Sequence, residues 1–212
     1  MICISLGNIK FERALEVSKK EDLVEIRADL INLDKKQLYQ ILNTPAQKVF
    51  TFRQSGIEDR IRLDFYRISL EKGVKYIDLD YASDRWILKN LGPSLSQSSV
   101  DLILSTHNYE RTPSFTELKK KMQELREAGA DIVKIACMVN DDEDIVNLMR
   151  LYRIPGRKII IGMGQKGIIL RVAALYMGAE FTFAAPENEK GTAPGQLSKK
   201  DIQEILSIMG PH

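Results

Sequence analysis

The 212-residue sequence contains little cysteine and little histidine, and its charges nearly balance. Two cysteines, Cys3 and Cys137, are too few for a disulfide framework, which indicates a reducing compartment. The 31 basic and 29 acidic side chains leave a net charge of +2, so the composition does not indicate binding to nucleic acid or to an anionic membrane surface. No segment reaches the roughly 18 apolar residues that a membrane span needs.

Targeting sequences and linkers are also missing. The start, MICISLGNIKF, has no basic stretch followed by a long apolar run, so we expect no signal peptide and a cytoplasmic protein. Without a Pro/Gly/Ser-rich linker, residues 1–212 are expected to form one domain. We expect no metal site, because His107 is the only histidine besides the C-terminal residue and neither HxH nor CxxC spacing occurs.

The sequence does contain one alternation, repeated about eight times, of a short apolar run followed by an amphipathic stretch. Gly73, Gly129 and Gly178 stand where helices should end. Ser114 and Glu117 predict a capping box at a helix start. The predicted strands are 2–6, 23–27, 48–53, 76–80, 100–106, 131–137, 158–163 and 180–185, and the clearest helices are 58–72, 114–128, 141–152, 168–177 and 198–209.

This alternation predicts parallel strands joined by helical crossovers. An open doubly wound sheet would alternate in the same way. About eight units, with no Gly-x-Gly-x-x-Gly after the first strand, favour closure into a single-domain (β/α)₈ TIM barrel.

Apolar and polar residues alternate within several predicted strands. The apolar face must meet the helices, so the ionisable face is expected to point into the barrel. These side chains gather toward the C-terminal ends of their strands, where barrel active sites are built. The inward set comprises Glu25, Arg27, Arg53, Asp78, Asp80, His107 and Lys134, with Met163 as a pocket wall.

Lys134 and His107 are the strongest candidates for chemistry. An inward lysine among apolar walls and other cations favours its neutral amine, which can attack a ketone and form an imine. The alternative is a lysine in an ion pair with Asp78, Asp80 or Glu25. A histidine that ends the neighbouring strand suits a group that takes and gives a proton near neutrality.

Two later segments add candidate ligands for a substrate. Arg171 follows the glycine-rich GMGQKG loop and could bind a carboxylate or phosphate, or could be a solvated helix arginine. Thr192 and Gln196 lie in a turn-rich loop that could cover the barrel mouth or could be a plain surface loop.

Taken together, the motifs resemble the type I 3-dehydroquinate dehydratase family. The similarity covers essentially the whole chain, and order, spacing and strand position agree. The matching runs are EIRAD at 25–29, TFR at 51–53, STHNY at 105–109, VKIA at 133–136, MGQKGIILR at 163–171 and APGQ at 193–196.

The resemblance implies a lyase that dehydrates 3-dehydroquinate to 3-dehydroshikimate, the third step of the shikimate pathway, without a cofactor. It implies that Lys134 forms the imine and that His107 is the acid and base. Arg171 would hold the substrate carboxylate, helped by Gln196 and by Thr192, where the family more often has serine. The ring hydroxyls would be bound by Glu25, Arg27 and Arg53, and the pocket walls or supports would be Met163, Phe183 and Ser5. The resemblance also suggests a homodimer, and some relatives are fused to shikimate dehydrogenase.

One position departs from the family pattern. Relatives often carry a glutamate four residues after the arginine of TFR, and it orients the catalytic histidine. Ile57 stands there, and Glu58 follows. Either Glu58 takes this role after a one-residue shift, or His107 is oriented by another group.

Two other functions fit parts of the pattern. A Schiff-base aldolase acting on a phosphorylated sugar would bind phosphate near the seventh and eighth strands. Glu187 and Glu189 follow the eighth strand, and their charge disfavours a phosphate there. A catalytically silent barrel would be expected to have lost Lys134 or His107, and both are present.

Overall fold

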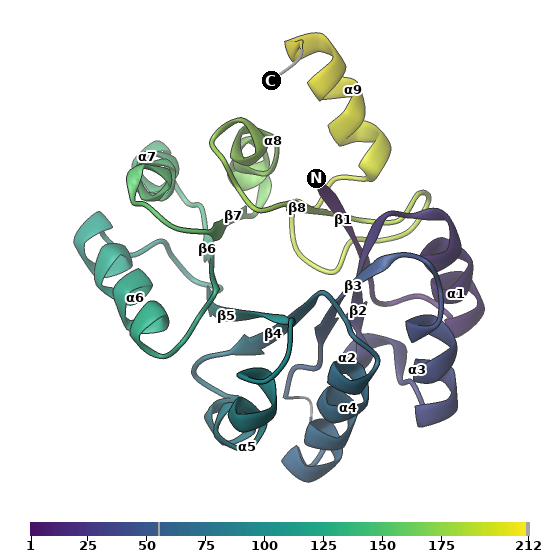
Figure 1. The fold of residues 1–212 in the computed structure, drawn as a ribbon. Coiled ribbons are helices and arrows are strands. Elements are labelled where there is room, and N and C mark those ends of the chain that lie inside the picture. The colour runs from purple at the N-terminus through teal and green to yellow at the C-terminus, as the bar shows by residue number, and fades with distance from the viewer. Residues whose placement is uncertain (55, 211–212) are drawn as a thin grey trace.

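The computed structural model describes residues 1–54 and 56–210, and over these residues eight parallel strands are surrounded by helices (Figure 1). Hydrogen-bonded neighbours follow the order β7-β6-β5-β4-β3-β2-β1-β8. The strands are β1 (Ile2–Leu6), β2 (Leu23–Arg27), β3 (Gln47–Thr51), β4 (Tyr76–Asp80), β5 (Asp101–Asn108), β6 (Ile132–Met138), β7 (Lys158–Met163) and β8 (Thr182–Ala184).

Helices connect the strands and form the outer ring seen in Figure 1. None of the helices in the described part of the chain is long and apolar enough to cross a membrane. The helices are α1 (Phe11–Lys20), α2 (Ala28–Ile31), α3 (Lys35–Leu42), α4 (Asp59–Glu71), α5 (Arg85–Leu95), α6 (Phe115–Glu127), α7 (Asp142–Arg150), α8 (Ile168–Tyr176) and α9 (Lys199–Met209), with short 3₁₀ turns η1 (Leu151–Arg153) and η2 (Gln165–Gly167).

The sheet curves into a nearly closed barrel. β1 pairs with both β2 and β8, and β7 pairs with β6. The N-terminal ends of the remaining neighbours, β7 and β8, are linked where the Glu180 N–H donates to the Lys158 carbonyl at 3.0 Å. The predicted (β/α)₈ TIM barrel is therefore confirmed.

Side chains of alternate strand residues fill the barrel interior in layers. The apolar residues near the N-terminal ends of the strands form an inner cluster that is separate from the main core between strands and helices. Polar and charged residues occupy the same inward face closer to the C-terminal ends. The inner cluster includes Cys3, Leu23, Val49, Tyr76, Ile103, Ile132, Ile159 and Phe181. The strand alternation thus predicted the direction of the charged residues. Inside the barrel they lie above a layer of apolar side chains.

Local signals placed several helix ends correctly. Ser114 and Glu117 form the predicted capping box of α6. Gly73, Gly129 and Gly178 follow helix ends with φ of 69°, 98° and 85°. In this left-handed region a side chain is strained, which favours glycine.

Among the strands, β3, β5 and β8 differ most from their predicted bounds, and β5 ends at Asn108, two residues after its predicted end. β3 ends at Thr51, two residues before the predicted end, because the Phe52 N–H donates to the hydroxyl oxygen of Tyr66 instead of continuing the ladder. β8 is only Thr182–Ala184, shorter than the predicted 180–185.

Candidate active site

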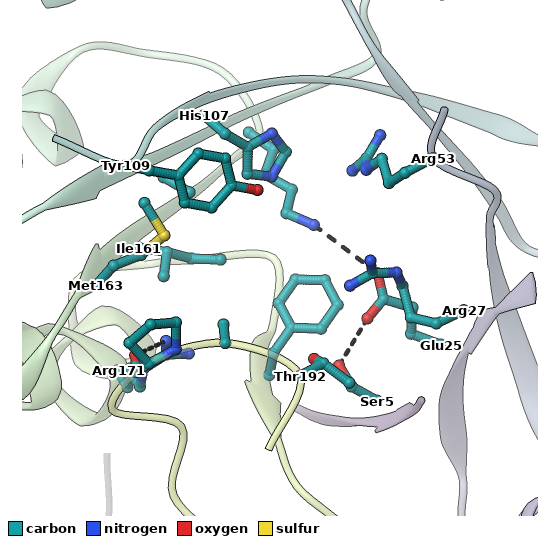
Figure 2. A pocket seen from close by; sticks show the side chains of 15 residues that line it. Ser5, Glu25, Arg27, Arg53, His107, Tyr109, Ile161, Met163, Arg171 and Thr192 are labelled. Carbon is teal, nitrogen blue, oxygen red and sulfur yellow. Dashed lines mark hydrogen bonds and ion pairs between the residues drawn. The ribbon is translucent and has the colours of Figure 1, made fainter. Parts of the chain in front are cut away.

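A pocket of about 120 Å³ opens at the C-terminal end of the barrel (Figure 2). Figure 2 shows the labelled side chains, which come from several strands and loops, gathered around one space. Its lining is Ser5, Glu25, Arg27, Arg53, His107, Tyr109, Lys134, Ala136, Ile161, Met163, Arg171, Phe183, Thr192, Ala193 and Pro194. The structure therefore brings together most of the residues that the sequence singled out.

Lys134 projects from β6 into this pocket with a side chain only 6% exposed. Its Nζ lies 2.7 Å from Oδ2 of Asp78 and 3.9 Å from Oε1 of Glu25. The ring of Phe183 lies on another side of the ammonium group, with its centroid 4.2 Å from Nζ. The expected apolar walls are present, since Ile161, Met163 and Phe183 line the pocket, but the nearest charged atoms belong to carboxylates and not to the expected cations.

Asp78 is the buried centre of this ionic network. Its Oδ1 accepts hydrogen bonds from Arg53 at 2.8 Å and from the Ser105 hydroxyl at 2.6 Å. Burial alone would raise the pKa of Asp78, but Arg53 and Lys134 outweigh burial and hold it well below its usual range. Asp78 is therefore ionised, and Lys134 is paired with it, as the ion-pair alternative foresaw.

His107 ends β5 and is oriented by Asp80. The Nδ1 atom of His107 lies 2.9 Å from Oδ2 of Asp80. The hydrogen bond with His107 and the nearby charge of Arg53 outweigh burial and lower the pKa of Asp80 to about 2. Burial lowers the pKa of His107, against the opposing effect of the Asp80 hydrogen bond. An ionised carboxylate can only accept, so Nδ1 carries the hydrogen and Nε2 is left with a free lone pair.

Glu58 does not join this arrangement. It is exposed at the N-cap of α4 and lies outside the pocket lining described above. Of the two alternatives for orienting His107, the one that assigns this role to Glu58 is corrected and the one that assigns it to another group holds, because Asp80 makes the contact with Nδ1.

Arg171 lies one turn into α8 and is 2% exposed, so it is not a solvated helix arginine. Its NH2 group donates to the Pro194 carbonyl at 3.2 Å. Within the described residues, its buried Nε has no hydrogen-bond partner. Burial lowers the pKa of Arg171 to about 10. A buried guanidinium with an unused donor beside a pocket is suited to an anionic ligand.

The residues on the opposite wall are held by fixed polar contacts. Glu25 accepts hydrogen bonds from the Ser5 hydroxyl at 2.6 Å and from the Thr51 hydroxyl at 3.0 Å. Arg27 forms a two-point pair with Asp29 at 3.0 and 2.6 Å. These bonds fix the carboxylate of Glu25 and the guanidinium of Arg27 before a ligand arrives.

The loop after β8 reaches the pocket through Thr192, as expected. Gln196 is absent from the pocket lining, and its side-chain carbonyl accepts hydrogen bonds from the backbone N–H and the hydroxyl of Thr192 at 2.6 and 3.0 Å. Glu189 pairs with Arg13 at 3.6 Å, and Glu187 accepts the Lys200 N–H at 2.9 Å. Both glutamates lie outside the pocket lining, and the expectation that their charge disfavours a phosphate stays a prediction.

Sequence reasoning missed two contributors. It placed Asp80 inward but considered it only as a partner of Lys134 and not of His107, although its alternation with Leu79 was visible. It also missed Tyr109, which is 66% exposed and stacks on His107 with ring centroids 5.9 Å apart and an interplanar angle of 11°. Strand alternation places Tyr109 on the same side as His107, and this was the available signal.

Comparisons with known proteins identify the family. The family described as type I 3-dehydroquinase matches residues 2–212. A 3-dehydroquinate dehydratase of Methanococcus vannielii is 30% identical over 221 residues, covering 99% of this chain and 100% of that protein. One from Alkaliphilus oremlandii is 31% identical over 237 residues, covering 100% and 92%.

Among solved structures, the 3-dehydroquinate dehydratase of Geobacillus kaustophilus superposes with a TM-score of 0.85 at 25% identity, covering 98% of this chain and 90% of that chain. The family match over nearly the whole chain, the curated relatives and this superposition all point the same way. The chain belongs to the type I 3-dehydroquinase family of enzymes.

Proposed function

We propose that this protein is a lyase that dehydrates 3-dehydroquinate to 3-dehydroshikimate through an imine on Lys134. One observation carries the proposal. The pocket combines an amine, a histidine whose Nδ1 is held by Asp80, and the buried Arg171 with an unused Nε donor. These three groups suit a ketone, an acidic C–H bond and a carboxylate, and all three occur in the proposed substrate.

The first half of the proposed reaction builds the imine. The neutral amine of Lys134 attacks the C3 ketone carbon, and the resulting carbinolamine takes up a proton from solvent and loses water to give a protonated imine. The protonated imine then withdraws electrons from the neighbouring C2–H bond. Arg171 would hold the carboxylate with help from Thr192, while Glu25, Arg27 and Arg53 would bind the ring hydroxyls.

The second half is a proton transfer by His107. Nε2 takes the C2 proton, because Nδ1 is occupied by Asp80. Nε2 then returns that proton to the C1 hydroxyl, which leaves as water while the C1–C2 double bond forms. A second water molecule hydrolyses the imine, releasing 3-dehydroshikimate and the Lys134 amine. No metal or organic cofactor takes part in this scheme.

Loop and wall residues have supporting roles in the proposal. Gln196 would act through Thr192, whose N–H and hydroxyl it accepts. Met163 and Phe183 would form apolar walls, and Ser5 would orient Glu25 through its 2.6 Å hydrogen bond.

The direct test incubates the purified protein with 3-dehydroquinate and follows the ultraviolet absorbance of the conjugated enone product. In parallel, product and borohydride are added, and the protein is digested and mapped by mass spectrometry. We expect turnover and a reduced adduct on the peptide that contains Lys134. Absence of turnover would refute the function, and turnover with an adduct elsewhere would refute the assignment of Lys134.

A homodimer and a cytoplasmic location complete the proposal. The dimer is suggested by the family resemblance. Light scattering coupled to size-exclusion chromatography would test it, since a mass near 24 kDa at assay concentrations would contradict a dimer.

A further inference from the structure

The pairing between β3 and β4 ends before these strands reach the pocket. Their register runs from Val49↔Tyr76 to Thr51↔Asp78 and stops there. In contrast, β4 continues along β5 as far as Asp80↔Ser105. Arg53 and Asp80 therefore lie beyond the last β3–β4 pair, and other contacts must hold these two strand ends together.

Three buried side chains behind the pocket, Arg62, Tyr66 and Asp84, make these contacts, and we call them the clamp. Arg62 donates from Nε to the Phe52 carbonyl at 3.0 Å and from NH2 to Oδ1 of Asp84 at 2.5 Å. The hydroxyl oxygen of Tyr66 accepts the Phe52 N–H at 3.0 Å and lies 3.2 Å from the Asp78 carbonyl. The clamp thus joins the backbones at the ends of β3 and β4.

Asp84 extends the clamp to the partner of His107. Its Oδ2 accepts the Asp80 N–H at 2.8 Å. Oδ1 of Asp80 accepts the N–H groups of Ala82 and Ser83, both at 3.1 Å. Both the backbone of Asp80 and one of its carboxylate oxygens are therefore fixed, and the other oxygen, Oδ2, is aimed at His107.

The clamp also lies close to Arg53, which is hydrogen-bonded to Asp78. NH1 of Arg53 is buried without a hydrogen-bond partner in the described part of the chain, and it lies 3.9 Å from Oδ2 of Asp84. Arg53 NH2 donates to Asp78. The clamp is therefore connected to both Asp78 and Asp80, the two carboxylates of β4 that face the site.

We propose that the clamp positions Asp80 so that His107 keeps its hydrogen on Nδ1 and its lone pair on Nε2. Arg62, Tyr66 and Asp84 are then positioning residues for the proton transfer, acting through Asp80 without touching the substrate. The inference rests on the proposed function, in which His107 is the base. A clamp that serves folding alone would affect stability and leave the tautomer of His107 and kcat unchanged.

The test uses Tyr66→Phe, Arg62→Lys and Asp84→Asn in the full chain. Tyr66→Phe deletes one hydroxyl and keeps the ring, so it is the variant most compatible with folding. Leu125→Ala is the control, because it removes a fully buried core side chain from α6 without altering the clamp. Thermal unfolding shows which variants are folded. Clamp variants are then compared with the control at a similar loss of melting temperature.

Two readouts separate positioning from folding. We expect kcat of the clamp variants to fall about 10–100-fold, in the range seen when residues that orient a catalytic ligand are lost, with KM and borohydride trapping at Lys134 little changed. Nitrogen-15 NMR of the imidazoles should show Nδ1–H in the parent and a mixture of tautomers in the variants. His212 is the only other histidine, so the two sets of signals can be assigned.

Several results would overturn the inference. One is the finding that His107 in the parent protein carries its hydrogen on Nε2, a measurement that requires no variant. Another is a folded clamp variant with the kcat and His107 tautomer of the stability-matched Leu125→Ala control. If the parent fails to turn over 3-dehydroquinate, the proposed function is refuted, and the NMR comparison still decides whether the clamp sets the tautomer.

Discussion

The Nδ1 atom of His107 lies 2.9 Å from Oδ2 of Asp80, and this contact determines which ring nitrogen is available for chemistry. The low pKa of Asp80, about 2, keeps its carboxylate ionised at any pH where the enzyme would work. The lowered pKa of His107 keeps the imidazole neutral near pH 7. His107 is therefore set up to accept a proton on Nε2.

Asp80→Asn tests this arrangement through the pH profile. In the parent, activity should be lost as the pH falls through the pKa of His107, so the acid limb of kcat/KM should lie below the usual histidine value of about 6.5. Asp80 raises the pKa of His107, so its neutralisation should move that limb to lower pH. Loss of orientation should lower kcat about 10–100-fold.

The control for this prediction is Asp101→Asn. Asp101 begins β5 at the opposite end of the barrel, where it pairs with Arg157. Its pH profile should match that of the parent. An acid limb that moves upward in Asp80→Asn would show that Asp80 does not support the charged imidazole.

Lys134→Met should abolish borohydride trapping and reduce turnover by on the order of 10³-fold or more, as loss of a nucleophile does. Lys48→Met is the matched control, because Lys48 is also buried on a strand but donates to the Thr44 carbonyl, away from the pocket. Peptide mapping of the trapped adduct is the measurement. An adduct that persists in Lys134→Met would contradict the imine assignment.

Strand periodicity predicted the barrel and the direction of its charged residues. Glu25, His107 and Lys134 alternate with aliphatic residues that must pack against the helix layer. The inward direction of these three side chains therefore follows from the two-residue period of a strand. The periodicity did not predict which of these side chains contact one another. The choice of Asp78 for Lys134 and of Asp80 for His107 depends on strand register and side-chain rotamers, which periodicity does not encode.

Positions near loops were harder to predict. Glu58 was one of two alternatives for orienting His107, and the sequence could not decide between them because the role depends on where α4 begins, one residue after Glu58. The role of Gln196 in binding substrate stays a prediction, but its hydrogen bond to Thr192 could not be predicted, because a loop has no repeating direction. The early end of β3 depends on Tyr66, 14 residues away in the sequence, which local patterns do not show.

Arg171→Met should weaken substrate binding more than turnover. The buried Nε has no partner in the described chain, so a substrate carboxylate would gain a hydrogen bond and an ion pair that methionine cannot offer. We expect KM to rise about 10–100-fold, since a hydrogen bond to a charged group contributes roughly 1.5–3 kcal/mol. Steady-state kinetics measure this, with Arg150→Met as the control, because Arg150 lies over Phe115 outside the pocket lining. An unchanged KM would remove Arg171 from the site.

Gly167→Ala should disturb both stability and substrate binding, because β7 and the start of α8 touch through their backbones there. A Cβ on Gly167 would lie 2.5 Å from the carbonyl carbon of Gly162 and 2.7 Å from its oxygen. Backbone atoms cannot turn aside as a flexible side chain can, so α8 must move away from β7. Overpacking of this kind costs about 1–3 kcal/mol.

The same movement would displace Arg171, which lies four residues further along the chain in α8. We therefore expect a lower melting temperature together with a higher KM in Gly167→Ala. Gly92→Ala in α5 is the control, since a Cβ there meets nothing within 4 Å and both properties should stay near those of the parent. A Gly167→Ala protein that melts lower but keeps the parental KM would show that Arg171 is held by contacts other than the β7–α8 approach.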